Sequence, residues 1–269
     1  MQQSAWDRDN GFDPQCQGIK AFDICITINE TNLMMRLDKF LCEAGKGTRT
    51  EVKKLIARGG VSVNGAVIKD AAAKIDENAD KICLDGEPVK YADFEYYMLN
   101  KPKGVISATR DKRDKNATCV TDLIQEKIRK DLFPVGRLDK DTEGLLIITN
   151  DGDMAHRLLS PKHHVDKTYY VELDGKASKE SVERIMAGVD IGDDKPTLPC
   201  QINMLSDSSC FITIQEGRYH EIKRLFKTED RTVSFLKRIS MGPISLDTEL
   251  EPGEYRMLSQ EEIEALKQA

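Results

Sequence analysis

Charged side chains are concentrated within seven consecutive residues near the middle of the chain, among them Arg137, Asp139, Asp141 and Glu143. They belong to a polar, glycine-bounded stretch, residues 136–144, which runs directly into the apolar or β-branched residues 145–149. An Asn-Asp-Gly turn signal then ends the apolar run. The pattern predicts a charged loop held by a buried strand, a common position for catalytic or ligand-binding side chains. The alternative is a solvated turn with ordinary surface charge.

Carboxylates at this spacing also suit a metal ion. Asp139, Asp141, Glu143 and Gly144 match the beginning of an EF-hand calcium loop. The twelfth position of such a loop should be Glu, but it is Asn150 here, and an apolar strand pattern occupies the place of the metal loop. The four histidines of the chain show no helical His-x-x-x-His spacing. We therefore expect no metal.

The whole segment from residue 136 reads Gly-Arg-Leu-Asp-Lys-Asp-Thr-Glu-Gly-Leu-Leu-Ile-Ile-Thr-Asn-Asp-Gly. It resembles the signature of the RsuA-type rRNA pseudouridine synthases, in which the Asp of Arg-Leu-Asp is the catalytic residue. The resemblance assigns that role to Asp139. In related synthases the preceding Arg fills the gap that a flipped base leaves in the RNA, and this position is Arg137.

Two later segments extend the resemblance. Residues 167–171, Lys-Thr-Tyr-Tyr-Val, are similar to a Lys-x-Tyr-x-Val motif of the family. That motif selects Tyr169 as the residue that stacks on the flipped uracil and assists removal of its C5 proton. Without the resemblance, a strand tyrosine would be read as plain packing.

The other segment, residues 217–224, reads Gly-Arg-Tyr-His-Glu-Ile-Lys-Arg and resembles the third motif of the family. Lys223 falls where the basic partner of the catalytic Asp lies, and Arg224 is the second choice. Glu221 stands in place of the usual Gln. This exchange adds a negative charge near the site and leaves the role of the position open.

The chemistry that the resemblance implies explains these residue types. Pseudouridine formation breaks the N1–C1′ bond of uridine, turns the uracil and joins C5 to C1′, so no atoms are gained and no cofactor is expected. An ionised carboxylate supplies the nucleophile or anionic stabiliser beside C1′. In a closed pocket a cation must oppose its desolvation, and Lys223 is the candidate. The sequence leaves open whether Asp139 attacks the ribose or the uracil ring.

Hydrophobic periodicity predicts the elements that hold these motifs. A strand beginning at residue 96 ends in a Lys-Pro-Lys-Gly turn, where Lys101 and Lys103 are placed to meet phosphate. The other predicted elements are helices at residues 121–130, 153–160 and 178–188, and strands at 167–173, 201–205 and 210–215. The fold class that the resemblance implies is α+β, with a mixed, largely antiparallel sheet and flanking helices in the catalytic domain.

A smaller module is predicted ahead of the catalytic domain. Residues 36–44 and 49–58 have the apolar spacing of two amphipathic helices, and a strand with an Asn-Gly turn follows. The pattern is similar to the RNA-binding module named after ribosomal protein S4. We expect its basic side chains to bind an RNA backbone, although a solvated helix face is the alternative. The residues assigned to this role are Arg36, Lys46, Arg49, Lys53 and Lys54.

Charge and composition narrow the class of protein. The net charge is −6, which argues against tight, sequence-independent RNA binding and favours a correctly shaped RNA substrate. Residues 36–58, however, hold seven basic and three acidic side chains, a local charge of +4 that suits RNA. No apolar run approaches the ~20 residues of a membrane span. Seven cysteines, an odd number without a Cys-x-x-Cys pair, favour reduced thiols and a cytoplasmic protein.

The predicted organisation has four parts. Residues 35–85 form the S4-type RNA-binding module, 86–95 a linker and 96–269 the catalytic domain. Residues 1–34 are either a flexible extension or lie upstream of a true start at Met34 or Met35.

The predicted protein is a monomeric isomerase that converts a specific uridine of 16S rRNA, alone or in an assembling small subunit. The Pro-Gly-Glu-Tyr-Arg sequence near the C-terminus favours the small subunit. One alternative is a 23S rRNA synthase of the sister branch. The other is a non-catalytic RNA-binding factor for ribosome assembly. The modified uridine itself is not encoded in the sequence, because that choice depends on RNA shape.

Overall fold

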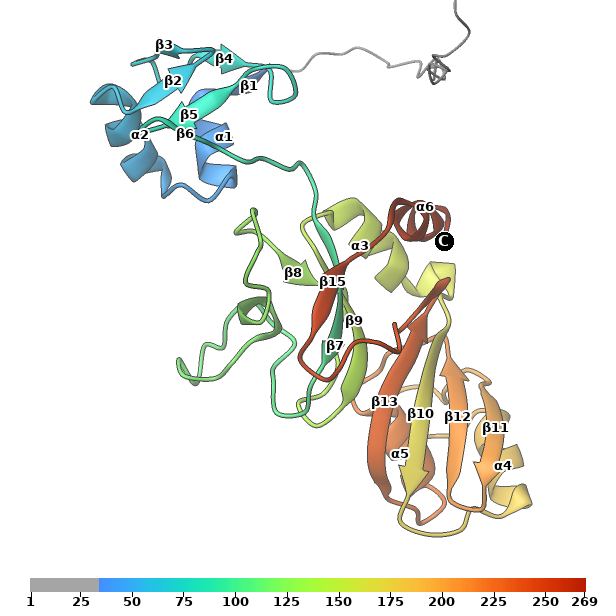
Figure 1. Ribbon diagram of the computed structural model, residues 1–269. Helices are drawn as coiled ribbons and strands as arrows, with labels where there is room; N and C mark the ends of the chain where they lie inside the picture. The colour runs from blue at the N-terminus through green and yellow to red at the C-terminus, as the bar shows by residue number, and fades with distance from the viewer. Residues whose placement is uncertain (1–33) are drawn as a thin grey trace, which may run out of the picture. The chain divides into compact units, whose positions relative to one another are not determined.

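The computed structural model describes residues 34–269 (Figure 1). The predictions for residues 1–33 lie outside this range. Within it, no helix has the length and apolar character that crossing a membrane requires.

The S4-type module consists of two helices and short strands. Helix α1 buries Phe40 and Leu41 against Val52 and Ile56 of helix α2, as the predicted spacing requires. A capping box begins α2, because the Thr48 backbone N–H donates to the Glu51 carboxylate at 2.7 Å and the Thr48 hydroxyl accepts from the Glu51 N–H. The elements are β1 (Met35–Arg36), α1 (Leu37–Glu43), α2 (Arg49–Ala57), β2 (Val61–Val63), β3 (Ala66–Val67), β4 (Lys74–Ile75), β5 (Ile82–Leu84) and β6 (Glu87–Pro88).

The catalytic domain is built on one mixed sheet, whose main path is ordered β11-β12-β10-β13-β9-β7-β15. Strand β13 pairs with β9 in parallel, and every other pairing in this sheet is antiparallel, which confirms the predicted sheet type. The strands are β7 (Tyr96–Lys101), β8 (Phe133–Pro134), β9 (Glu143–Thr149), β10 (Lys167–Leu173), β11 (Gln201–Ser206), β12 (Ser209–Ile214), β13 (Val233–Met241), β14 (Ile244–Ser245) and β15 (Tyr255–Met257).

The central strands β7 and β9 are buried on both faces. On β9, Leu145 and Ile147 enter one hydrophobic cluster, whereas Leu146 and Ile148 enter the other. Such strands read as continuous apolar runs because both faces are covered. The run that follows the charged loop is therefore a rigid support for it.

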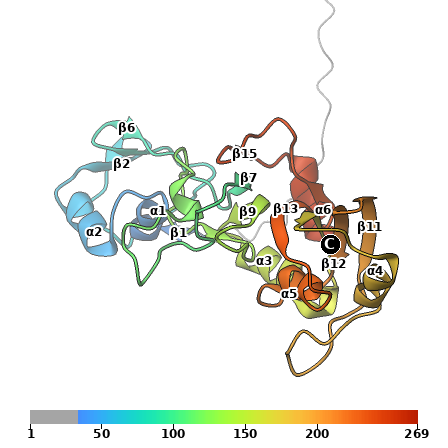
Figure 2. The same cartoon turned by 90° about the horizontal axis from the view of Figure 1, so that it is seen from below.

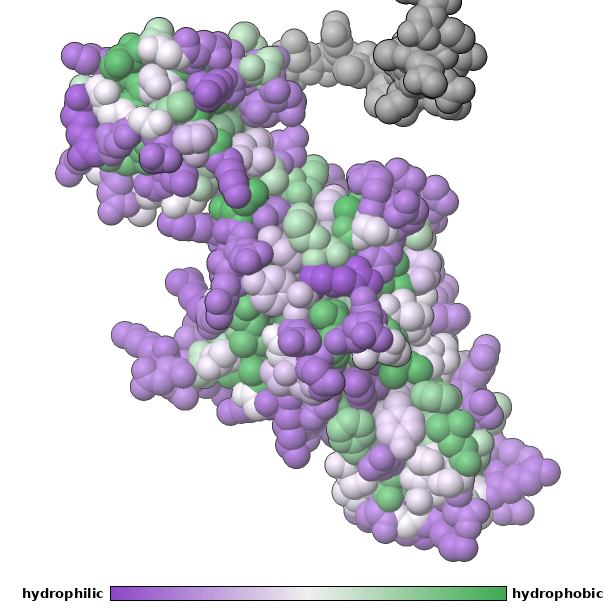
Figure 3. All heavy atoms as spheres, viewed as in Figure 1, coloured by the Kyte–Doolittle hydropathy of each residue, from purple (hydrophilic) through white to green (hydrophobic). Residues whose placement is uncertain are grey.

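Helices cover the two faces of the sheet. Helices α3 (Gly152–Leu159) and α6 (Gln260–Gln268) contribute to one cluster, and α4 (Lys179–Met186) and α5 (Glu221–Lys227) to the other. Figure 2 shows α4 and α5 beside strands β11 and β13, which they contact. Hydrophilic side chains occupy most of the face seen in Figure 3, with small hydrophobic patches between them.

The prediction of a helix at residues 121–130 is wrong. Only a 3-10 turn, η1 (Val120–Asp122), forms there, and a second one, η2 (Pro161–His163), follows α3. The backbone N–H groups that a helix would pair internally donate to distant side chains instead. The Glu95 carboxylate accepts from Arg129 at 2.7 Å, and the Tyr255 hydroxyl accepts from Gln125 at 3.1 Å. Tertiary partners therefore override the local periodicity.

Candidate active site

Lys101, at the end of β7, anchors the backbone of the charged loop of residues 136–144. Its Nζ donates to the carbonyl oxygens of Thr142 at 2.9 Å and Asp139 at 3.1 Å. The side chain is fully buried, and burial lowers the pKa of Lys101 to about 8. The expectation that Lys101 meets phosphate is wrong, because its ammonium group fastens the backbone of the loop. Lys103, beside it, is exposed.

Ser107 fixes the same loop from the side. Its hydroxyl donates to the Leu138 carbonyl at 2.8 Å and accepts from the Leu138 N–H at 3.1 Å. Gly144 ends the loop with φ +101°, and a Cβ there would overlap the Arg238 carbonyl oxygen of β13. Glycine is therefore required where the parallel strands β9 and β13 meet.

Asp139 lies beside the ammonium group of Lys223. Lys223 Nζ, on α5, is 2.9 Å from Asp139 Oδ2 and 2.6 Å from Asp141 Oδ1. Burial lowers the pKa of Lys223, but hydrogen bonds to Asp141 and Asp139 outweigh that effect, so its pKa is raised overall. His220 also approaches, with Nε2 at 3.6 Å from Asp139 Oδ1. The arrangement stabilises a negative charge on a carboxylate that is still 28% exposed.

Tyr169 and Tyr170 lie on opposite faces of β10. Tyr169 is only 7% exposed and lines the cavity beside Asp139. Tyr170 contacts Phe211 and Phe235, and its hydroxyl donates to Glu172 at 2.9 Å. Strand alternation therefore brings to the cavity the tyrosine that the motif selects.

Asp139, Tyr169 and Lys223 line one small cavity of about 70 Å³, together with Leu138 and Leu236. Adjoining hollows of about 480 Å³ and about 610 Å³ share some of its lining residues. Arg137 lines all three spaces and is exposed. A small cavity that has a carboxylate paired with a cation in its wall, and the exposed Arg137 at its border, suits a flat base attached to a polyanion.

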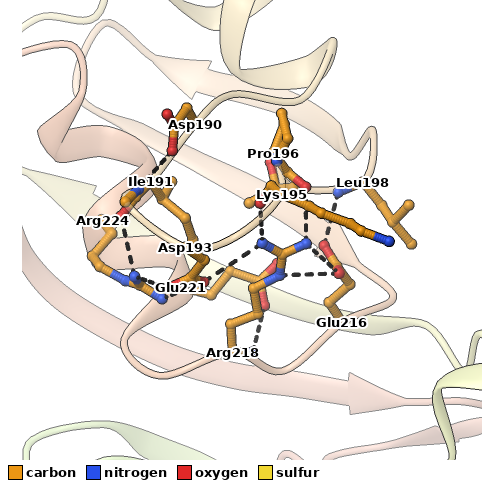
Figure 4. A network of polar contacts seen from close by, with 12 residues as sticks. Asp190, Ile191, Asp193, Lys195, Pro196, Leu198, Glu216, Arg218, Glu221 and Arg224 are labelled. Atoms are coloured by element: carbon orange, nitrogen blue, oxygen red, sulfur yellow. Dashed lines mark hydrogen bonds and ion pairs between the residues drawn. The ribbon is translucent and has the colours of Figure 1, made fainter.

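Arg224 lies away from Asp139. Its guanidinium donates to the Asp193 carboxylate at 2.7 and 3.0 Å and to the Ile191 carbonyl at 3.1 Å (Figure 4). Arg218 contacts the same loop through the carbonyl oxygens of Lys195 and Pro196. These contacts brace residues 216–224 against residues 190–198, so Arg224 as seen here is engaged with protein. Its assignment to RNA binding stays a prediction.

Glu221, the unusual residue of the third motif, is 5% exposed and forms part of the cavity wall. Its carboxylate accepts from the Arg218 backbone N–H at 2.8 Å. Burial raises the pKa of Glu221 above its ordinary value. Position 221 therefore fixes the turn that enters α5.

The basic side chains predicted on the S4-type module are exposed: Arg36, Lys46, Arg49, Lys53 and Lys54. Arg36 forms a bidentate pair with Asp38 at 2.8 and 2.9 Å, which leaves the residues around α2 as the freer cations. No group of three or more potential metal ligands occurs within residues 34–269.

Sequence reasoning missed Lys101 as a support for the loop, and it also missed Ser107 and His220. The signal for Lys101 was its place at the end of a strand whose first four residues, 96–99, read as apolar, since a lysine in a buried strand must be paired or functional. His220 had a signal in its position three residues before Lys223.

The described geometry agrees with comparisons to known proteins. The family model for RNA pseudouridylate synthase matches residues 95–228, and that for the S4 domain matches residues 35–81. This chain belongs to the RNA pseudouridine synthase family, whose members are isomerases.

Individual relatives span nearly the whole described part. The chain is 45% identical over 238 residues to "Uncharacterized RNA pseudouridine synthase YtzG" of Bacillus subtilis, which covers 87% of this chain and 99% of that protein. It is 40% identical to "Ribosomal small subunit pseudouridine synthase A" of Vibrio cholerae, over 86% and 99% of the two chains. A solved structure described as a pseudouridylate synthase superposes with a TM-score of 0.61 at 36% identity, over 86% of this chain and 99% of that one.

Proposed function

We propose that this enzyme isomerises one specific uridine of 16S rRNA to pseudouridine. The observation that carries the proposal is the contact between Lys223 and Asp139, at 2.9 Å, in a cavity walled by Tyr169. The small-subunit assignment is supported by relatives named "Ribosomal small subunit pseudouridine synthase A" from Vibrio cholerae and Pasteurella multocida, at 40% and 39% identity.

The reaction needs one carboxylate and no cofactor. The N1–C1′ bond breaks, the uracil turns, C5 joins C1′, the C5 proton leaves and N1 gains a proton. Asp139 supplies the negative charge beside the reacting atoms. Lys223 stabilises this carboxylate where the surrounding protein excludes water. The product has the same atoms as the substrate.

RNA must present its target outside the base stack. Flipping the uridine costs roughly a few kcal/mol. Tyr169, with its ring in the cavity, stacks on the flipped base and assists loss of the C5 proton. Arg137, at the shared mouth of the hollows, fills the space that the base leaves.

The S4-type module adds affinity for the RNA backbone through the exposed cations Lys46, Arg49, Lys53 and Lys54, with Arg36 beside them. Since the whole chain has a net charge of −6, we propose a shaped, partly assembled small subunit as the substrate. A cytoplasmic location and a monomeric state stay predictions.

A pseudouridine map tests this function. Transcripts of 16S and 23S rRNA, each alone and in partly assembled subunits, are incubated with the protein or with Asp139→Asn as the matched control. One new pseudouridine in 16S RNA, absent with the variant, is the expected result. A product in 23S RNA would move the enzyme to the large-subunit branch. RNA binding without product on any substrate would support the assembly factor instead.

A further inference from the structure

An aromatic pair, Tyr219 and His220, lies at the edge of the catalytic cavity, and its outer member, Tyr219, has no part in the mechanism above. The ring of Tyr219 stacks on the ring of His220 with centroids 3.8 Å apart and planes inclined by 19°. Tyr219 is 76% exposed, which is the largest exposed fraction among the large hydrophobic side chains of residues 34–269. The Tyr219 ring is therefore accessible to a ligand.

The backbone fixes the orientation of the pair. His220 has a left-handed conformation, with φ +51°, at the residue before α5. Such a conformation is unfavourable for a residue other than glycine and persists where its surroundings enforce it. Here the Glu221 carboxylate holds the Arg218 N–H, and the Glu221 N–H donates to the Arg218 carbonyl at 3.2 Å. The turn brings His220 toward Asp139 while Tyr219 is left open to solvent.

The pair lines a groove that leads to Asp139. This groove, of about 610 Å³, is bordered by Tyr219 and His220 and by the exposed cations Arg137 and Lys140. It adjoins the small cavity that contains Tyr169, and Asp139 and His220 border both. A groove with one open aromatic face and two cations matches a nucleotide, which has a flat base and an anionic phosphate.

We propose that Tyr219, supported by His220, is a stacking platform for the nucleobase next to the target uridine in the RNA strand. The inference rests on the proposed function and deepens it, because it assigns a second base-binding position. Stacking there holds the neighbouring nucleotide while the target enters the small cavity. Tyr219 thus contributes to substrate binding, and the reacting atoms are left to Asp139.

The first test separates ring stacking from a structural role. Tyr219→Ala, Tyr219→Phe and wild type are compared by steady-state kinetics on the RNA in which the pseudouridine map locates the modified uridine. We expect Tyr219→Ala to raise KM by about 10- to 100-fold, the scale of losing one base–aromatic stack, with a much smaller change in kcat. Tyr219→Phe keeps the ring and should restore KM. Phe94→Ala removes another exposed ring, one that does not line the groove, and should leave both constants unchanged.

The second test locates the stacked base. The same proteins are assayed on RNAs in which the nucleotide immediately 5′ or 3′ of the target is abasic. The KM penalty of Tyr219→Ala should disappear at one of these two positions, because no base remains there to stack. The stacking platform would be contradicted if Tyr219→Ala raised KM equally on all RNAs, or if its KM were normal. In either case, turnover by the wild type would still support the proposed function. A wild-type protein that forms no pseudouridine would contradict both.

Discussion

Lys223 and Arg224 are consecutive residues of one helix, yet they have opposite surroundings. Lys223 ends in the cavity, where Asp139 and Asp141 are its partners. Arg224 ends outside the cavity, against Asp193 and the Ile191 carbonyl. Neighbouring helical residues are separated by roughly 100° around the axis, so they serve two different faces.

The difference separates a cation available to chemistry from a cation that braces the protein. Lys223 contacts carboxylates that line a space open to a ligand. Arg224 instead joins α5 to the loop of residues 190–198 (Figure 4). The same contrast applies to Lys101, which is fully buried and has backbone carbonyls as partners. Charge alone does not reveal which of these roles a basic residue has.

Among changes to the basic residues compared above, Lys223→Met should have the largest effect on catalysis. The nearly isosteric side chain removes the cation beside Asp139, and kcat should fall by about 10²- to 10³-fold. Unfolding free energy should change by less than about 1 kcal/mol, because the carboxylates left behind are partly solvated. Rapid-quench kinetics and urea unfolding measure the two quantities. A normal kcat would remove Lys223 from the mechanism.

Lys101→Met should act mainly on stability. The substitution leaves the carbonyls of Asp139 and Thr142 without their shared donor, and we expect a loss of roughly 3 kcal/mol in unfolding free energy. Lys103→Met, at an exposed neighbouring position, is the matched control and should unfold like wild type. If both variants unfold alike, the fastening role of Lys101 is wrong.

Arg224→Ala tests the role of the other residue, a cation that braces the protein. It removes a partly exposed, bidentate pair, so unfolding free energy should fall by about 1 kcal/mol. Because Lys223 is untouched, kcat should change far less than in Lys223→Met. Parallel urea unfolding and kinetics of the two variants measure the contrast. A catalytic defect as large as that of Lys223→Met would contradict the bracing role of Arg224.

The smallest expected effect concerns Asp141 and pH. The hydrogen bond from Lys223 lowers the pKa of Asp141 below its ordinary value of 3.8. A lowered folded-state pKa means that the contribution to stability is present above pH 3.8 and is lost as the pH falls through the folded pKa. The small stability difference between wild type and Asp141→Asn should therefore shrink from about pH 7 to about pH 3 in urea titrations. A difference that grows on acidification contradicts this pairing.

The elements that local patterns determine were predictable. Strand β10 spans Lys167–Leu173 as its alternation predicted, and the buried strand β9 follows the charged loop. The family motif selected Tyr169 rather than Tyr170, and strand alternation explains why the two side chains face opposite sides. The α5 and α6 helices were not predicted. Helix α6 has a Ser259–Glu262 capping box that signals its start.

Features that depend on distant partners were not predictable. Residues 121–130 have helical spacing, but Glu95 and Tyr255 accept their N–H donors. The burial of Lys101 and the exposure of Tyr219 likewise follow from which segments meet in the fold. The motif placed Lys223 ahead of Arg224 as the partner of Asp139, but it could not predict that Arg224 pairs with Asp193, because that contact depends on the packing of α5.

The central claim is that the Asp139 carboxylate performs uridine isomerisation in this cavity. The most direct measurement is tritium release from RNA labelled at uridine C5, comparing wild type with Asp139→Asn, since that proton leaves only when C5 is joined to C1′. We predict release by wild type and a loss of about 10⁴-fold in Asp139→Asn, with unchanged thermal unfolding. Full tritium release by the folded variant would contradict the account.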